Sequence, residues 1–131
     1  MRITFIILLA GLLFLGCENN NNYKGITGVW IVEEQGDVTP YQRYNVSIRS
    51  DQYIDNLYII SNLHRIGEQY DTNLLLNDLQ VEMSTQFVGN YTFSGGAGVL
   101  DPDFKKMTFT YHVQSNQKGI NEEVRSTFKR E

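Results

Sequence analysis

The 131-residue chain has one cysteine, two histidines and two prolines. The scarcity of cysteine argues against a disulfide-bonded domain, and that of histidine against a metal site. A lone cysteine, Cys17, cannot form an intramolecular disulfide, so burial alone must hold a folded domain together. His64 and His112 lie far apart, and neither has a second ligand at metal-binding spacing. We therefore predict surface histidines without a special role, no metal site and no cofactor.

Clusters of basic residues are also lacking. The chain carries 11 Lys and Arg against 15 Asp and Glu, which gives a net charge of -4. The pairs Lys105-Lys106 and Lys129-Arg130 are short, whereas neutralising a phosphate backbone needs clustered cations. This balance argues against a nucleic-acid partner.

Catalytic motifs are absent from the sequence as well, with no nucleophile elbow and no phosphate-binding loop. Adjacent carboxylates such as Glu33-Glu34 and Glu122-Glu123 would point to opposite faces of a strand. Asp101-Pro102-Asp103 is ordinary turn chemistry and lacks the further carboxylates of a calcium loop. We therefore predict that the protein is not an enzyme.

The N-terminus carries the one distinctive motif. Met1 and Arg2 precede an apolar run from residue 3 to 15, and Gly16 and Cys17 follow it at once. About 13 apolar residues are too few for a spanning helix, which needs roughly 20. This order resembles a bacterial lipoprotein signal, in which the cysteine is lipidated and becomes the first mature residue. An ordinary secretory signal with a chance cysteine is the alternative.

The domain boundaries follow from this motif. We predict a signal peptide at residues 1–16, a lipidated Cys17 with a flexible Asn-rich tether over 17–24, and one folded domain over 25–131. The segment Glu18-Asn19-Asn20-Asn21-Asn22 has no apolar periodicity and cannot bury enough surface to offset the entropy of ordering.

Beyond the tether the chain shows no long helical periodicity, and short apolar runs alternate with turn residues. The alternation is clearest where Tyr44, Val46 and Ile48, and later Met107, Phe109, Tyr111 and Val113, share one face. The final run sets Val124, Ser126 and Phe128 against outward Glu123, Arg125, Thr127 and Lys129. We expect eight strands, at 25–34, 41–49, a third ending with 57–62, 70–76, 79–83, 86–99, 106–114 and 120–130.

Two turns can be assigned in more detail. Asn77-Asp78 is a two-residue link suited to a type I′ hairpin. Gly95, Gly96 and Gly98 interrupt the run that puts Tyr91, Phe93, Ala97 and Val99 on one face, so a β-bulge or sharp bend is expected there. Eight short strands predict an all-β fold, a small antiparallel up-and-down barrel, with a two-sheet β-sandwich as the alternative.

The whole mature domain resembles the calycin-like, lipocalin-like β-barrel lipoproteins of the Bacteroidota. The residues that carry the resemblance are Gly28-Val29-Trp30, Ile60-Ser61-Asn62-Leu63 before a glycine corner, Val88-Gly89, the interrupted run 93–98, Tyr111-His112-Val113, Arg125 and Phe128. In lipocalins the tryptophan lies at the closed end of the barrel beneath a basic residue of the last strand. The resemblance implies that role for Arg125, Lys129 or Arg130.

For function, the sequence favours a non-catalytic binding or interaction module, held at the outer membrane by its lipid, with an envelope protein or glycan as partner. The periplasmic or surface face stays undecided. The alternative is a lipocalin-like carrier of a small apolar ligand, in which Trp30, Tyr44, Phe93 and Tyr111 would line the cavity. Aromatic residues on strands are more often core, and we expect a filled barrel.

Overall fold

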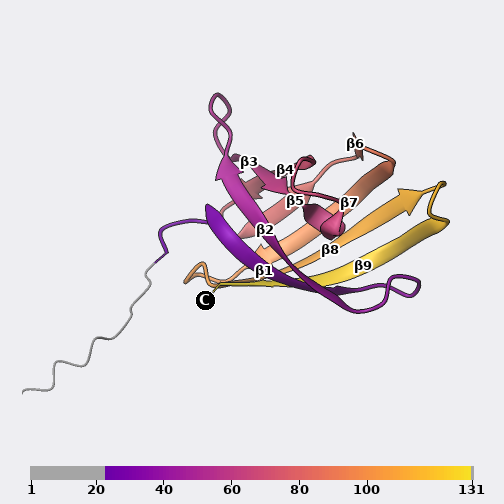
Figure 1. Cartoon of the computed structure of the whole chain (residues 1–131). Helices are drawn as coiled ribbons and strands as arrows, with labels where there is room; N and C mark the ends of the chain where they lie inside the picture. The colour runs from indigo at the N-terminus through magenta and orange to yellow at the C-terminus, as the bar shows by residue number, and fades with distance from the viewer. Residues whose placement is uncertain (1–22, 131) are drawn as a thin grey trace, which may run out of the picture.

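The computed structural model describes residues 23–130, so the predicted signal peptide and Cys17 lie outside the described residues. Within them no helix is long and apolar enough to cross a membrane. The structure is all-β, as expected (Figure 1). Its elements are β1 (Gly28–Gln35), β2 (Gln42–Ser50), β3 (Leu57–Ser61), the 3-10 helix η1 (Leu63–Arg65), β4 (Asp71–Asn77), β5 (Gln80–Met83), β6 (Gln86–Val88), β7 (Tyr91–Leu100), β8 (Lys106–Ser115) and β9 (Ile120–Lys129).

The strands close into a barrel. Neighbours pair antiparallel in the order β5-β4-β3-β2-β1-β9-β8-β7-β6, and the further pairing of β5 with β7 joins the two sides of the sheet. Eight strands form the closed barrel and β6 is an additional short strand on β7. The predicted barrel is therefore confirmed over the sandwich, and closure removes the exposed edges that an open sheet would leave.

The alternation read from the sequence places the core correctly on three strands. In β2 the side chains of Tyr44, Val46 and Ile48 are buried, and in β9 those of Val124 and Phe128 are fully buried. In β8 every second side chain points inward, and all four predicted core residues are at most 1% exposed. These faces follow from the two-residue period of a strand because one side of the barrel wall is dry.

The predicted strand 86–99 was wrong, because the chain reverses within it. β6 and β7 form a hairpin in which Val88 pairs with Tyr91 across the turn Gly89-Asn90. Gly89 has φ of 58°, a conformation that glycine adopts at no steric cost. A Gly-Asn pair is a recognised hairpin signal, so this turn was readable from the sequence.

The expected β-bulge is present in β7. Its pairing with β8 shifts register between Ser94 and Ala97, and Gly95 has φ of 59°. The extra residue reverses the phase of the strand, so Ala97 and Val99 point outward, with Val99 56% exposed. The prediction that these two share a face with Phe93, which is buried, was therefore wrong.

The glycines of β7 also make room inside the barrel. A Cβ at Gly98 would come within 2.4 Å of the backbone oxygen of Thr108, and a Cβ at Gly96 within 2.8 Å of the Phe109 ring. The ring of Phe109 therefore occupies space that a side chain on β7 would otherwise fill.

The hairpin between β4 and β5 is offset by one residue from the prediction. Asn77 pairs with Gln80, so the two turn residues are Asp78 and Leu79. Of the two turn residues only Asp78 has positive φ, at 53°, whereas a type I′ turn requires positive φ at both, so the predicted turn type was wrong.

At Asn73, where β4 is not paired with β5, a glutamine side chain forms hydrogen bonds with the backbone of β4. The amide of Gln86 donates from Nε2 to the carbonyl oxygen of Asn73 and accepts at Oε1 from its N–H, both at 2.7 Å. This amide therefore takes the place of a neighbouring strand and satisfies a backbone pair on β4 that β5 does not reach.

Candidate functional site

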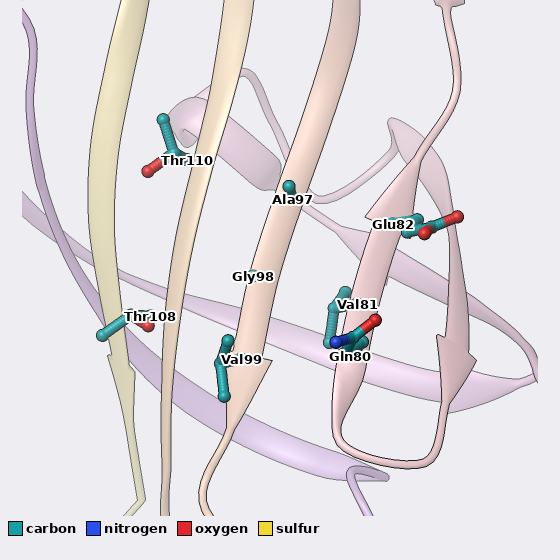
Figure 2. A pocket seen from close by; sticks show the side chains of 8 residues that line it. All are labelled: Gln80, Val81, Glu82, Ala97, Gly98, Val99, Thr108 and Thr110. Carbon is teal, nitrogen blue, oxygen red and sulfur yellow. The ribbon is translucent and has the colours of Figure 1, made fainter.

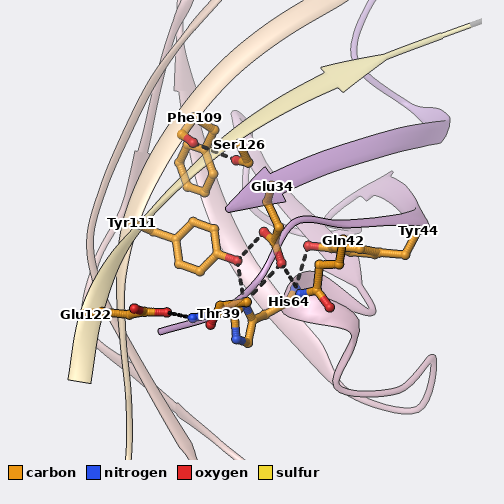
Figure 3. A network of polar contacts seen from close by, with 9 residues as sticks. All are labelled: Glu34, Thr39, Gln42, Tyr44, His64, Phe109, Tyr111, Glu122 and Ser126. Carbon is orange, nitrogen blue, oxygen red and sulfur yellow. Dashed lines mark hydrogen bonds and ion pairs between the residues drawn. The ribbon is translucent and has the colours of Figure 1, made fainter. Parts of the chain in front are cut away.

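A buried polar cluster occupies one end of the barrel interior, which we call the His64 end. It is formed by Glu34 on β1, Gln42 and Tyr44 on β2, His64 in η1 and Tyr111 on β8 (Figure 3). Glu34 points inward because it shares the face of Trp30 and Val32, and it is only 2% exposed.

The Glu34 carboxylate collects three donors. The Tyr111 hydroxyl donates to Oε2 at 2.5 Å, and Gln42 donates from Nε2 to Oε1 at 2.6 Å. The His64 Nδ1 lies 3.0 Å from Oε1, and also 3.0 Å from the Tyr111 hydroxyl. An ionised carboxylate only accepts, so the His64 contact is a hydrogen bond in the tautomer that carries its proton on Nδ1, and partners from three elements then surround the carboxylate.

The corner around η1 holds His64 in this position. His64 has φ of 58°, and Asn62 and Arg65 also have positive φ, which is uncommon for residues other than glycine. The side chain of Asn62 accepts from the N–H of Gly67 and donates to the carbonyl of Asn45, and the His64 N–H donates to the Tyr44 hydroxyl at 2.8 Å. These bonds offset the backbone strain.

His64 was therefore wrongly predicted as a surface histidine. Its residue exposure is 6%, and its ring packs edge-on against Tyr91, Phe93 and Tyr111. His112 does lie on the outer face of β8, where Nε2 contacts Oδ1 of Asn121. The available signal for the cluster was Glu34, a carboxylate in the inward phase of a strand.

Burial sets the protonation of the two phenols. It raises the pKa of Tyr111 well above its ordinary value, and the neighbouring Tyr44 and the charge of Glu34 raise it further. Burial also raises the pKa of Tyr44, again with a contribution from Glu34. Both hydroxyls therefore stay protonated and act as neutral hydrogen-bonding groups across the physiological range.

A second carboxylate fastens the loop that crosses this end. Glu122 on β9 accepts from the N–H groups of Val38 and Thr39, the latter at 2.8 Å, in the loop between β1 and β2. Burial opposes the charge, but the hydrogen bonds from Thr39 and Val38 outweigh it and lower the pKa of Glu122. Gly36 lies beneath this carboxylate, and a Cβ there would meet Oε1 at 2.4 Å, so a larger residue would displace the Glu122 side chain.

The opposite end of the interior, the Trp30 end, is closed by apolar packing. The indole of Trp30 is fully buried, and its Nε1–H donates to the carbonyl of Ile26 at 2.8 Å. The guanidinium of Arg130 lies 4.1 Å from the Trp30 ring centroid and 4.2 Å from that of Tyr23. Of the three basic residues considered above, Arg130 is thus the one over the tryptophan.

The four residues suggested as ligand-lining are all in the core, but not together. Phe93 and Tyr111 pack at the His64 end with ring centroids 5.7 Å apart, and Tyr44 joins them through the backbone of His64. Trp30 packs against Phe128 at the other end. Side chains therefore occupy the interior at both ends, as expected for a filled barrel, and a ligand-lining role stays a prediction.

Hollows are found instead on the outer surface. One of about 420 Å³ crosses β5, β7 and β8 (Figure 2). Cross-strand pairing sets Glu82, Ala97 and Thr110 in one row. The next row holds Gln80, Val99 and Thr108. The small Ala97 leaves a shallow apolar floor between polar edges, an arrangement that can hydrogen-bond a partner laid across the strands.

Comparison with known proteins identifies no family. No family model matches the chain, and no curated protein matches it. Among solved structures, a redesigned β-barrel superposes with a TM-score of 0.53 at 11% identity, covering 81% of this chain and 91% of that one. The similarity shows the fold alone. A barrel hosts many functions, so function must be argued from the surfaces and side chains described above.

Proposed function

We propose that this protein is a membrane-anchored lipoprotein of the cell envelope, of the calycin-like, lipocalin-like type, that works as a non-catalytic binding module through its outer surface. The observation that carries the proposal is the contrast between a barrel interior packed with side chains and hollows on its outside. The Trp30–Arg130 pairing is consistent with the lipocalin-like resemblance. The motif ending at Cys17 supports the anchor.

The buried cluster supports a structural rather than a catalytic role. The side chains of His64 and Glu34 are 4% and 0% exposed, so a substrate has no direct route to them. Their hydrogen bonds join β1, β2, β8 and η1, which fixes one end of the barrel. The packed interior likewise favours the interaction module over a carrier of a small apolar ligand.

The test uses the outer hollow across β5, β7 and β8 described above, which we call the groove. The full-length protein is purified in detergent from envelope membranes, and co-purifying protein or glycan is compared for the unvaried chain, Ala97→Arg and Ser47→Arg. Both positions are exposed and outward, but Ser47 lies on β2 and lines a separate outer hollow of about 410 Å³, so the two variants also distinguish one hollow from the other. We expect a specific partner that is lost with Ala97→Arg and kept with Ser47→Arg. Equal capture by all three variants contradicts the assignment of the groove.

Two further measurements address the other parts of the proposal. Native mass spectrometry of the same preparations decides between module and carrier, because a stoichiometric small-molecule adduct favours the carrier. Protease shaving of whole cells then decides between the periplasmic and the surface face of the outer membrane.

A further inference from the structure

The loop between β2 and β3, residues 51–56, holds two apolar side chains out into solvent. Tyr53 is 86% exposed and Ile54 is 57% exposed. Loop tips are usually small and polar, so a neighbouring aromatic and aliphatic pair at a tip is unusual and marks an interaction surface.

The loop is well organised rather than frayed. The carboxylate of Asp51 accepts from the N–H groups of Tyr53 and Ile54 at 2.9 and 2.8 Å. The N–H of Asp51 donates to the carbonyl of Leu57 at 2.8 Å, and Asn56 has the positive φ that the reversal needs. These bonds satisfy the backbone within the loop and leave the two side chains pointing away from the barrel.

The loop lies at the end of the barrel where the described chain begins. A hollow of about 520 Å³ is lined by Tyr23, Lys24, Gly25, Thr27, Ser50, Tyr58 and Arg130. Residues 50 and 58 flank the loop, and residue 23 is the first described residue. In Figure 1 the start of β1, the end of β2 and the end of β9 lie on the left, at this end of the barrel.

Covalent geometry brings this end close to the anchor. Six residue steps separate Cys17 from Tyr23 in the sequence, and six steps span at most about 20 Å. If Cys17 is lipidated, as proposed above, Tyr23 and the Trp30 end of the barrel must lie within about 20 Å of the bilayer. Lys24 lines the hollow at this end and is exposed, so its positive charge is available to lipid phosphate groups.

We propose that the 51–56 loop is a second membrane contact, in which Tyr53 and Ile54 enter the interfacial layer of the bilayer while the lipid on Cys17 holds the chain. Tyrosine suits this layer because its ring is apolar and its hydroxyl is polar. The contact fixes the orientation of the barrel and directs the His64 end away from the lipid.

The test places a fluorophore at the loop tip. An alkylated Cys17 has no reactive thiol, so Tyr53→Cys provides the only labelling site for an environment-sensitive nitrobenzoxadiazole dye. The matched control is Phe87→Cys, an aromatic that is 83% exposed on β6 at the opposite end of the barrel. Both full-length lipoproteins are reconstituted in vesicles of phosphatidylethanolamine and phosphatidylglycerol containing a headgroup-nitroxide lipid.

We expect several-fold stronger quenching by the nitroxide lipid, and emission at shorter wavelength, for the dye at position 53 than at position 87. Equal quenching at the two positions overturns the membrane contact. The unvaried protein separates this failure from that of the anchor. If it takes up dye at Cys17 and does not partition into vesicles, the lipid anchor itself is wrong.

Discussion

At the Trp30 end the interior is closed by an indole under a guanidinium, whereas at the His64 end a buried carboxylate collects donors from a phenol, an amide and an imidazole. Apolar closure tolerates small shifts because dispersion and burial are non-directional. Polar closure requires every partner in place, since an unpaired buried group costs its full desolvation. The two ends should therefore respond differently to substitution.

The largest effect is expected at the Trp30 end. Trp30→Ala removes the largest fully buried side chain and leaves a cavity, which should lower the free energy of unfolding by about 3 to 5 kcal/mol. Urea unfolding of the full-length protein in detergent, followed by circular dichroism, measures it. A loss under about 1 kcal/mol would contradict the closed-end assignment, because large-to-small core changes rarely cost so little.

A smaller but more specific loss is expected at the His64 end. Tyr111→Phe keeps the ring and removes only the hydroxyl that donates to Glu34, so it should cost about 1.5 to 3 kcal/mol, the range for a hydrogen bond to a charged group. The control is Tyr41→Phe at an exposed tyrosine, which should stay within about 0.5 kcal/mol. Equal effects of the two variants in the same denaturant titration would show that the Tyr111 hydroxyl contributes nothing to the free energy of unfolding.

The hydrogen bonds that Glu122 accepts from the loop between β1 and β2 should make the free energy of unfolding depend on pH. Glu122→Gln loses the charge on two loop hydrogen bonds, which should cost about 1 to 2 kcal/mol near neutral pH. The folded pKa of Glu122 lies below the ordinary 4.5, so the stabilisation is fully present above pH 4.5 and is lost as the pH falls through the folded value.

The difference between the unvaried chain and Glu122→Gln should therefore shrink in acid. Thermal melts at a series of pH values measure it. Glu123→Gln, on the exposed face of the same strand, is the control and should not show this convergence. A difference that stays constant down to low pH would exclude the charge as the cause.

An exposed ion pair on the outer face of the barrel should have the smallest effect on the free energy of unfolding, and it serves as the reference for both ends. Arg49 and Asp71 form an ion pair at 2.8 Å, and the hydrogen bond from Arg49 lowers the pKa of Asp71. Their side chains are 50% and 43% exposed, so Asp71→Asn should cost no more than about 0.5 kcal/mol, and less at high salt. Melts at low and high ionic strength would detect a larger contribution.

The two ends also differ in how far the sequence predicted them. Trp30 and a basic residue of the last strand were expected at one end from a short motif, and Arg130 fills that place. The cluster at the other end was missed, because His64 lies in a corner whose backbone has no repeating pattern. Glu34 and Glu122 stood in the inward phase of their strands, and that phase was the usable signal.

Alternation of apolar and polar residues by itself determined the all-β fold and the buried faces of β2, β8 and β9, because a strand repeats every two residues. Only the tertiary structure decided the register shift that the bulge in β7 produces and the meeting of β5 with β7. Closure and the Glu34–His64–Tyr111 contacts join residues far apart in the chain. Their geometry depends on the register of every intervening strand, which local periodicity does not specify.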